Sequence, residues 1–186
     1  MIVIISGPSG VGKSTIVEEL LHRYQDMHRS ISVTTRDPRP GEADGVDYHF
    51  VTESMFQKWI DNDLFAEYAS ICGHHYGTLK SSLADVKPDE IVVLTIDIHG
   101  GLNIKHLFPT ALMVFLKPPD VTELERRLEK RGSETEEEIA GRIDLGHFEM
   151  TFAKDYDYMV TNNDLNTTVA IVDSIIRNSL RRQEPI

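Results

Sequence analysis

The sequence has very little cysteine. Cys72 is the only cysteine among 186 residues, so the chain can form neither an internal disulfide nor a metal site built from several thiolates. Long apolar runs are missing as well, because none approaches the roughly 20 residues that a membrane-spanning helix needs. The N-terminal apolar run has no basic segment before it, which argues against a signal peptide. We therefore expect a cytoplasmic protein with no membrane partner.

Basic residues are also scarce. The chain has 19 Lys and Arg against 30 Asp and Glu, which gives a formal net charge of −11. This balance argues against a nucleic-acid partner or a membrane surface. It also means that an anionic substrate must be bound by cations gathered locally, so clusters of arginine are informative. The length and the 40% apolar content are those of one globular domain.

The most informative stretch is the first fourteen residues. Residues 2–6 form a short β-branched run that predicts a buried strand. The following residues fit the phosphate-loop pattern G-x-x-x-x-G-K-[ST] at every fixed position, and they are Gly7, Pro8, Ser9, Gly10, Val11, Gly12, Lys13 and Ser14. Apolar residues at helical spacing come next, so Lys13 and Ser14 lie at the start of a predicted helix.

Each residue type in this loop has a chemical reason. Glycines allow positive φ and leave backbone N–H groups open to an anion, and a helix N-terminus adds unpaired donors. Lys13 can reach the β- and γ-phosphates, and the Ser14 hydroxyl can bind Mg²⁺. A glycine-rich turn with a chance lysine would not require a strand before it and a helix after it. The loop therefore predicts a nucleoside triphosphate site, without saying where the γ-phosphate goes.

Strands and helices alternate along the rest of the chain. Further strands are predicted at 31–34, 46–51, 91–96, 111–116 and 158–161, with a β-hairpin over 65–78. Helices are predicted after Thr52, Gly101, Asp120 and Ser133, and a last one begins with Asn166 as its cap. This order predicts an α/β fold with a parallel sheet and ligands at the carboxyl ends of its strands.

Two sets of residues between the first helix and the core strand at 91–96 point to a second substrate. Arg36 and Arg39 lie in a turn shortly before Tyr48, and two guanidinium groups with a phenol could bind a phosphate. The alternative is a solvated arginine pair held by Asp37 and Glu42. Glu67 is a separate acid in an aromatic stretch, and on residue type alone a surface position on the hairpin is the simpler interpretation.

A long motif now brings these residues together, and it spans residues 32–50 as Ser32-x-Thr34-Thr35-Arg36-x-Pro38-Arg39-x-Gly41-Glu42-x-x-Gly45-x-Asp47-Tyr48-x-Phe50. This motif resembles the GMP-binding segment of guanylate kinases. Glu67, followed nine positions later by Tyr76-Gly77-Thr78, is similar to the second half of that segment. Arg127, Arg131 and Arg142 match the lid arginines of the family, and residues 158–165 resemble its late strand and the loop that follows.

The resemblance covers nearly the whole chain and implies a three-layer P-loop kinase fold. Its parts would be a core of residues 1–31, 81–120 and 146–186 with a parallel sheet, a small mixed β GMP-binding insert at 32–80 and a helical lid at 121–145. The implied activity is transfer of the γ-phosphate of ATP to GMP, and to dGMP, in purine nucleotide metabolism. The implied cofactor is Mg²⁺ with ATP, and the protein would be a monomer or a homodimer.

The resemblance also assigns roles to residues. On the acceptor side, the GMP phosphate would be held next to Gly77 by Arg36, Arg39, Tyr48 and Tyr76. Glu67 would accept hydrogen bonds from guanine N1–H and the N2 amine. Guanine O6 would accept hydrogen bonds from Ser32 and Thr78, and Asp97 would help to hold the base. On the donor side, the loop from Gly7 to Thr15 and Asn162 would bind ATP, Ser14 would bind the metal, and Lys13, Arg127, Arg131 and Arg142 would act in catalysis.

Two positions depart from the family pattern, and two other functions remain open. Thr95 stands where the family usually has an acid, and His99 stands where it usually has Gln. We expect a modest effect on GMP or Mg²⁺ handling at most. The alternative functions are a non-catalytic interaction module and a kinase for another phosphorylated acceptor. The intact phosphate loop argues against the first, and Glu67, Tyr76 and Asp97 argue against the second.

Overall fold

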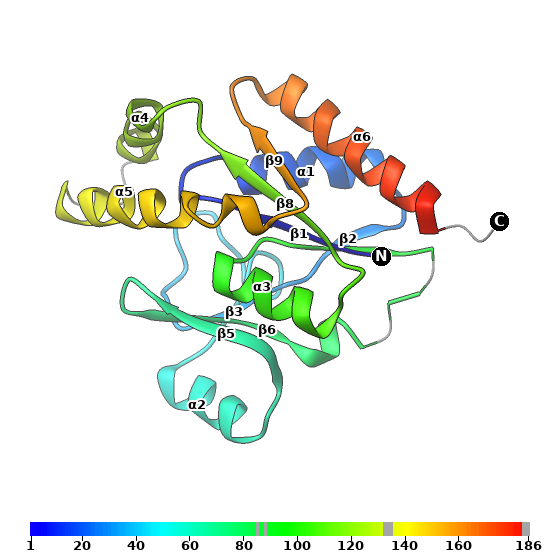
Figure 1. Ribbon diagram of the computed structural model, residues 1–186. Helices are drawn as coiled ribbons and strands as arrows, with labels where there is room; N and C mark the ends of the chain where they lie inside the picture. The colour runs from blue at the N-terminus through cyan, green and yellow to red at the C-terminus, as the bar shows by residue number, and fades with distance from the viewer. Residues whose placement is uncertain (85, 88, 132–135, 184–186) are drawn as a thin grey trace.

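The computed structural model describes residues 1–84, 86–87, 89–131 and 136–183. Its centre is a five-stranded sheet in which every neighbouring pair is parallel. The strands in spatial order are β2 (Met27–Arg29), β7 (Ile91–Leu94), β1 (Ile2–Ser6), β8 (Leu112–Lys117) and β9 (Tyr158–Thr161). The strand that carries the phosphate loop therefore lies in the middle of the sheet (Figure 1).

Helices cover both faces of this sheet, which confirms the three-layer α/β fold. Helices α1 (Lys13–Arg23) and α6 (Leu165–Gln183) pack on one face, and α3 (Ile98–Leu107) packs on the other (Figure 1). Successive strand residues point to opposite faces, so Val3 and Ile5 join the first core while Ile2 and Ile4 join the second. Strands buried on both sides explain the continuous apolar runs of the sequence.

A second, smaller sheet lies beside the core and is mixed, as expected. Its order is β4 (His49–Phe50), β3 (Val33–Thr34), β6 (His74–Leu79) and β5 (Phe65–Ile71), with one parallel and two antiparallel pairs. Helix α2 (Glu53–Asp61) begins at Thr52, whose hydroxyl accepts a hydrogen bond from the Met55 amide. Phe56 of α2 stacks on Phe65 of β5 with ring centroids 4.5 Å apart. This sheet thus has a small apolar core of its own.

Two further helices form the region predicted to be the lid. Helix α4 (Val121–Arg131) begins after Asp120, whose carboxylate accepts a hydrogen bond from the Glu123 amide at 2.7 Å. Helix α5 (Glu136–Met150) leads into a 3-10 turn, η2 (Ala153–Asp155), and then into β9. A second such turn, η1 (Lys80–Ser82), follows the hairpin. Both lid helices lie at the same end of the molecule as the phosphate loop (Figure 1).

Four details of the sequence prediction are wrong, and the first is that the helix expected after Gly101 already begins at Ile98. The core strand β2 was not anticipated, because its residues Met27–Arg29 alternate in polarity and are too few to give a period. The strand expected over 46–51 is reduced to His49–Phe50, since a turn occupies the residues before it. The cap of α6 is Asp164 and not Asn166, because the Asp164 carboxylate accepts the Thr167 amide at 2.9 Å.

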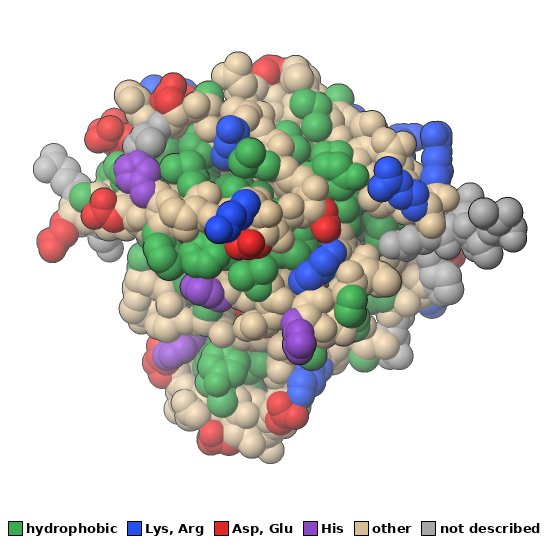
Figure 2. All heavy atoms as spheres, in the orientation of Figure 1, with side chains coloured by type: hydrophobic (Ala, Val, Ile, Leu, Met, Phe, Trp, Pro, Cys, Tyr) green, Lys and Arg blue, Asp and Glu red, His purple; other side chains and the backbone are tan. Residues whose placement is uncertain are grey.

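The surface agrees with the acidic composition. On the face seen in Figure 2, most described Lys and Arg side chains lie apart among acidic and apolar ones, and a small group lies at the upper right of the view. Within the described part of the chain, no helix is long and apolar enough to cross a membrane.

Candidate active site

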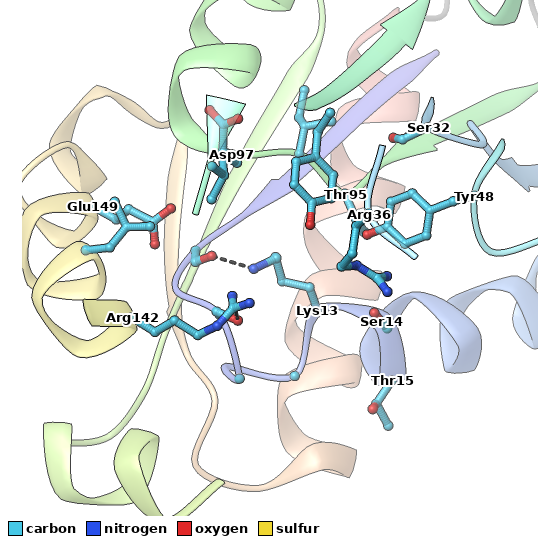
Figure 3. Close-up of a pocket in the computed structure, with 18 of the residues that line it drawn as sticks. Lys13, Ser14, Thr15, Ser32, Arg36, Tyr48, Thr95, Asp97, Arg142 and Glu149 are labelled. Carbon is cyan, nitrogen blue, oxygen red and sulfur yellow. Dashed lines mark hydrogen bonds between the residues drawn. The ribbon is translucent and has the colours of Figure 1, made fainter. Parts of the chain in front are cut away.

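The phosphate loop joins β1 to α1 and is shaped by close backbone contacts. Gly7, Gly10 and Gly12 all have positive φ, at 142°, 84° and 101°. A side chain at Gly7 would place its Cβ 2.1 Å from the carbonyl oxygen of Leu116, so only glycine fits there. The Lys13 ammonium donates to the carbonyl oxygens of Gly7 at 2.5 Å and Pro8 at 3.1 Å, which holds it across the loop (Figure 3).

Arginines of the lid helices reach this loop from above. Arg127 of α4 donates to the carbonyl oxygens of Val11 and Asn162, each at 3.2 Å. Its Nε also donates to the Glu123 carboxylate at 2.7 Å. Arg142 of α5 donates to the Ser9 hydroxyl at 3.0 Å. Two of the three predicted lid arginines therefore converge on the loop. The side chain of Arg131 lies outside the described residues, so its predicted role stays a prediction.

Asn162 supports the loop from behind. Its side chain is buried, and its side-chain amide donates to the Val11 carbonyl at 2.7 Å. The backbone carbonyl of Asn162 accepts a hydrogen bond from Arg127. It does not line the cavity described below. Asn162 thus links the loop to the lid in this structure, and its predicted contact with ATP stays a prediction.

The acceptor arginines lie in the segment that follows β3 of the second sheet. Arg36 is bound by both carboxylate oxygens of Glu42, at 3.0 and 2.9 Å, and its guanidinium lies 5.5 Å from the centre of the Tyr48 ring. The pairing with Glu42 agrees with the alternative in which acidic neighbours hold the arginines. Arg36 is not solvated as that alternative requires, because only 10% of its side chain is exposed. Arg36, Arg39, Tyr48 and Tyr76 all line one cavity.

Burial also raises the pKa of Tyr48 above its ordinary value, an effect that Tyr76 and then Glu42 enhance and that Arg36 and Arg39 oppose. Its ring lies 6.1 Å from that of Tyr76 at a steep angle. At neutral pH the Tyr48 phenol is therefore protonated and can donate a hydrogen bond to an anion. Four donors from separate strands and turns thus face the same space.

Glu67 is buried, contrary to the simpler expectation of a surface position on the hairpin. It is 6% exposed on β5 and lines the cavity. Burial raises its pKa to about 7, the Thr78 hydroxyl opposes that shift by donating to it at 2.5 Å, and the negative charge of Asp97 adds to it. The single hydroxyl proton of Thr78 is used on Glu67 in this structure, and its predicted donation to guanine O6 stays a prediction. Thr78 itself does not line the cavity.

Helix α3 is fitted closely around Glu67. Asp97 caps this helix by accepting the Gly100 amide at 3.0 Å. A Cβ at Gly100 would lie 2.5 Å from the outer carboxylate oxygen of Glu67, so the absence of a side chain lets the two elements meet. The position of Glu67 therefore depends on β5, β6 and α3 together.

One cavity of about 520 Å³ joins the two halves (Figure 3). The predicted site residues on its wall are Gly7, Ser9, Gly10, Gly12, Lys13, Ser14, Thr15, Ser32, Arg36, Arg39, Tyr48, Glu67, Tyr76, Gly77, Asp97, Arg127 and Arg142. Pro8 and Val11 belong to the loop but, like Thr78 and Asn162, are not on the wall. The described lining residues include six Lys or Arg side chains and three carboxyl groups. The cavity wall therefore has an excess of basic residues, whereas the whole chain has an excess of acidic ones.

The sequence prediction missed two charged residues of this wall. Arg126 lies next to Arg127 on α4 and pairs with Glu123, and Glu149 lies near the end of α5. The helical period could have revealed Glu149, because Arg142, Leu145 and Glu149 are separated by three and four residues and so share one face. Thr95, which departs from the family pattern, also lines the cavity, whereas His99 lines a neighbouring apolar pocket.

The wall suits a hard cation only in combination with a ligand. Ser14 offers a hydroxyl oxygen beside Lys13, and the described residues contain no group of three or more His, Cys, Asp or Glu side chains able to hold a metal. Mg²⁺ usually keeps waters and binds substrate phosphates with one or two protein ligands. The residues present therefore fit a magnesium ion that enters with a nucleotide.

The comparisons with known proteins agree with this geometry. A family model described as guanylate kinase matches residues 1–179. The chain belongs to the guanylate kinase family. It is 42% identical over 177 residues to a guanylate kinase of Caldanaerobacter subterraneus subsp. tengcongensis, covering 95% of this chain and 86% of that one. It is also 42% identical over 178 residues to a guanylate kinase of Prochlorococcus marinus subsp. pastoris, covering 95% and 97%.

Solved structures give the same result. The crystal structure of guanylate kinase from Anaplasma phagocytophilum aligns with a TM-score of 0.80 at 28% identity, covering 97% of this chain and 86% of that one. A shikimate kinase from Bacteroides thetaiotaomicron aligns with a TM-score of 0.56 at 15% identity over 95% of this chain, which shows a shared fold alone. The guanylate kinase resemblance of the sequence is therefore confirmed, and with it the P-loop kinase fold.

Proposed function

We propose that this guanylate kinase family member is an ATP:GMP phosphotransferase that forms ADP and GDP. The observation that carries the proposal is the single cavity, which has the phosphate loop and lid arginines at one end and the buried Glu67 with its arginines and tyrosines at the other. A site with two anion-binding ends and one base-reading carboxylate fits two nucleotides whose phosphates meet.

The donor end binds the triphosphate of ATP. Loop N–H groups and the N-terminus of α1 receive its oxygens, and Lys13 neutralises charge on the β- and γ-phosphates. Ser14 is the residue that would hold Mg²⁺, which supplies further charge neutralisation when bound. Arg127 and Arg142 close this end from the lid.

The acceptor end selects guanine. An ionised Glu67 accepts from N1–H and the N2 amine, while Ser32 donates to O6. Adenine presents an acceptor at N1 and a donor amine at C6, so both contacts would be mismatched. Arg36, Arg39, Tyr48 and Tyr76 then hold the GMP phosphate opposite the γ-phosphate.

Transfer itself needs no nucleophilic side chain. A phosphate oxygen of GMP attacks the γ-phosphorus in line, the bond to the β-bridging oxygen breaks, and ADP leaves. The residues contribute by placing the two phosphates and by neutralising charge on the moving group. Closure of the lid would also exclude water, which would otherwise hydrolyse ATP.

An assay of ADP release across several acceptors tests the proposal. ATP and Mg²⁺ are supplied with GMP, dGMP, AMP, CMP or UMP, and release is expected with GMP and more weakly or equally with dGMP. No release with GMP, or a preference for AMP, would contradict the assignment. The absence of catalysis together with intact binding of GMP would favour an interaction module. The cytoplasmic location and the monomeric or homodimeric state stay predictions.

A further inference from the structure

The second buried carboxyl group of the cavity, that of Glu149, has no assigned task. Glu149 is 9% exposed, and its carboxylate makes no hydrogen bond or ion pair with another residue in the described part of the chain. Glu67, which is 6% exposed, has the Thr78 hydroxyl as a partner. The Glu149 oxygens are not among the fully enclosed polar atoms of the described residues that lack a partner, so the carboxyl group is open to the cavity and available to whatever binds there.

The surroundings of Glu149 contain charges of both signs. Figure 3 shows its carboxyl group directed from α5 into the space bounded by Asp97, Lys13 and Arg142. Lys13 at the head of α1 and Arg142 on α5 favour the ionised form, and Asp97 at the head of α3 opposes it. Tyr156, beyond η2, also senses the charge of Glu149, and His99 borders the adjoining pocket.

Because of these opposing influences, the carboxyl group of Glu149 changes its protonation state near neutral pH. Burial raises the pKa of Glu149 to about 7, Lys13 and Arg142 moderate the rise, and Asp97 adds to it. The ionised form therefore depends on two cations that are also the proposed ligands of the ATP phosphates. Whatever neutralises these cations removes the support for the negative charge.

ATP would do this directly. Its phosphates bring several negative charges to Lys13 and Arg142, which then no longer stabilise a nearby carboxylate. Repulsion between the phosphates and an ionised Glu149 adds to the effect. A protonated carboxyl group instead has an O–H that can donate to a phosphate oxygen.

We propose that Glu149 is a positioning residue, the resident counter-charge of Lys13 and Arg142 without nucleotide, and that it takes one proton from solvent when the ATP phosphates bind. The ionised form offsets the charge of Lys13 and Arg142, and the neutral form does not repel the triphosphate once it has arrived. The inference rests on the proposed binding of ATP and adds a proton to it.

Calorimetry of MgATP binding without GMP tests this inference on the whole chain. Titrations at about pH 7.5 in two buffers of different ionisation enthalpy report the protons exchanged. The wild type is expected to take up about 0.7 proton, because the free carboxyl group is mostly ionised at that pH and the bound one is not. Its affinity for MgATP should accordingly fall above pH 7, by up to about tenfold per pH unit.

Matched variants assign the proton to Glu149. Glu149→Gln should remove most of the uptake and make MgATP affinity nearly independent of pH, so that at about pH 8 it binds more tightly than the wild type, by up to about tenfold. Glu149→Asp keeps a titratable group and should keep the uptake. Glu137→Gln makes the same chemical change at an exposed position of α5 and should behave as the wild type.

The outcomes separate this inference from the proposed function. MgATP binding without proton uptake by the wild type, or equal uptake by the wild type and Glu149→Gln, would overturn the role of Glu149 alone. The first of these needs no variant, so a poorly folded variant cannot hide the answer. Failure of the wild type to bind MgATP at all would overturn the proposed function and this inference with it.

Discussion

The two ends of the cavity are built in different ways. The donor end comes mainly from one continuous stretch, residues 7–15, whose backbone is set by positive-φ glycines and by a strand and a helix on either side. The acceptor end gathers side chains from the segments on either side of β3, from β5 and β6, from a turn, and from the N-cap of α3. A backbone cradle depends on local geometry, whereas a set of side chains depends on every element that carries them.

The difference also appears in the two buried carboxyl groups. Burial raises the pKa of both Glu67 and Glu149 to about 7. Glu67 is fixed by the Thr78 hydroxyl and by contact with Gly100, as expected of a group that reads a base. Glu149 has cations around it and no direct partner, as expected of a group that responds to charge. Each end of the site can therefore be perturbed separately.

Lys13→Ala should give the largest difference between the effect on turnover and the effect on GMP binding. Loss of the ammonium group removes charge neutralisation on the moving phosphoryl group, so we expect kcat to fall by about 10³-fold. GMP affinity should stay within about twofold, because the acceptor residues lie on other elements. Steady-state kinetics and calorimetry with GMP measure the two effects. An equal loss in GMP binding and turnover would show that the ends are not independent.

Glu67→Gln should impair the use of GMP and leave the binding of MgATP intact. The amide replaces one acceptor oxygen by a donor, which faces the donors of guanine, so we expect kcat/KM for GMP to fall by about 10²-fold. MgATP affinity should be unchanged, and calorimetry without GMP checks this. Discrimination between GMP and AMP should narrow as well. Unchanged GMP kinetics would remove Glu67 from base recognition.

The pH dependence of GMP binding should follow Glu67. Guanine needs the ionised carboxylate, and the carboxyl group of the free site titrates at about pH 7. GMP affinity should therefore rise with pH through this range and fall below it, by up to about tenfold per pH unit. MgATP binding should show the reverse trend through Glu149. Binding curves measured from acid to alkaline pH for the wild type and Glu67→Gln test this, and a dependence that survives in the variant would assign it to another group.

Thr78→Val should have a smaller effect of the same kind. Valine matches the shape of threonine but removes the proton donated to Glu67, and that donation lowers the pKa of the carboxyl group. We expect GMP affinity to fall about fivefold and the midpoint of its pH profile to move upward. Thr78→Ser keeps a hydroxyl and serves as the control. A midpoint that does not move would mean that Thr78 only fills space.

The smallest effects are expected at the two departures from the family pattern. Thr95 lines the main cavity and His99 does not. Thr95→Glu should therefore change the KM for GMP or the Mg²⁺ requirement by about threefold, whereas His99→Gln should change neither by more than about twofold. Kinetics at varied GMP and Mg²⁺ measure both. Unchanged kinetics in the combined variant would show that these positions only support the structure.

Much of the donor end could be predicted from the sequence because its signals are local. The run 2–6, the loop motif and the apolar spacing of α1 each depend on neighbours along the chain, and all three appear in the structure. The capping of α2 by Thr52 is local in the same way. Local signals failed where a strand was very short, as in β2, or where two polar residues competed for one cap, as with Asp164 and Asn166.

The acceptor residues were found by their resemblance to a family and not by their chemistry. On residue type alone, Glu67 is better placed on the hairpin surface, and its burial follows from the packing of α3 against the β5–β6 hairpin. The use of the Thr78 proton on Glu67 is likewise invisible in the sequence, since the two residues meet across the β5–β6 ladder. The link from Asn162 to Val11 joins residues far apart in the chain.

The sequence by itself determined that a triphosphate loop begins the chain and that strands and helices alternate behind it, because backbone dihedrals and hydrophobic period are properties of short segments. Only the tertiary structure decided which charges face one another. It brought Glu149 within reach of Lys13 and Arg142, paired Arg36 with Glu42, and buried Glu67 against Gly100. Electrostatic free energies depend on distance and burial in space, and neither is a property of position along the chain.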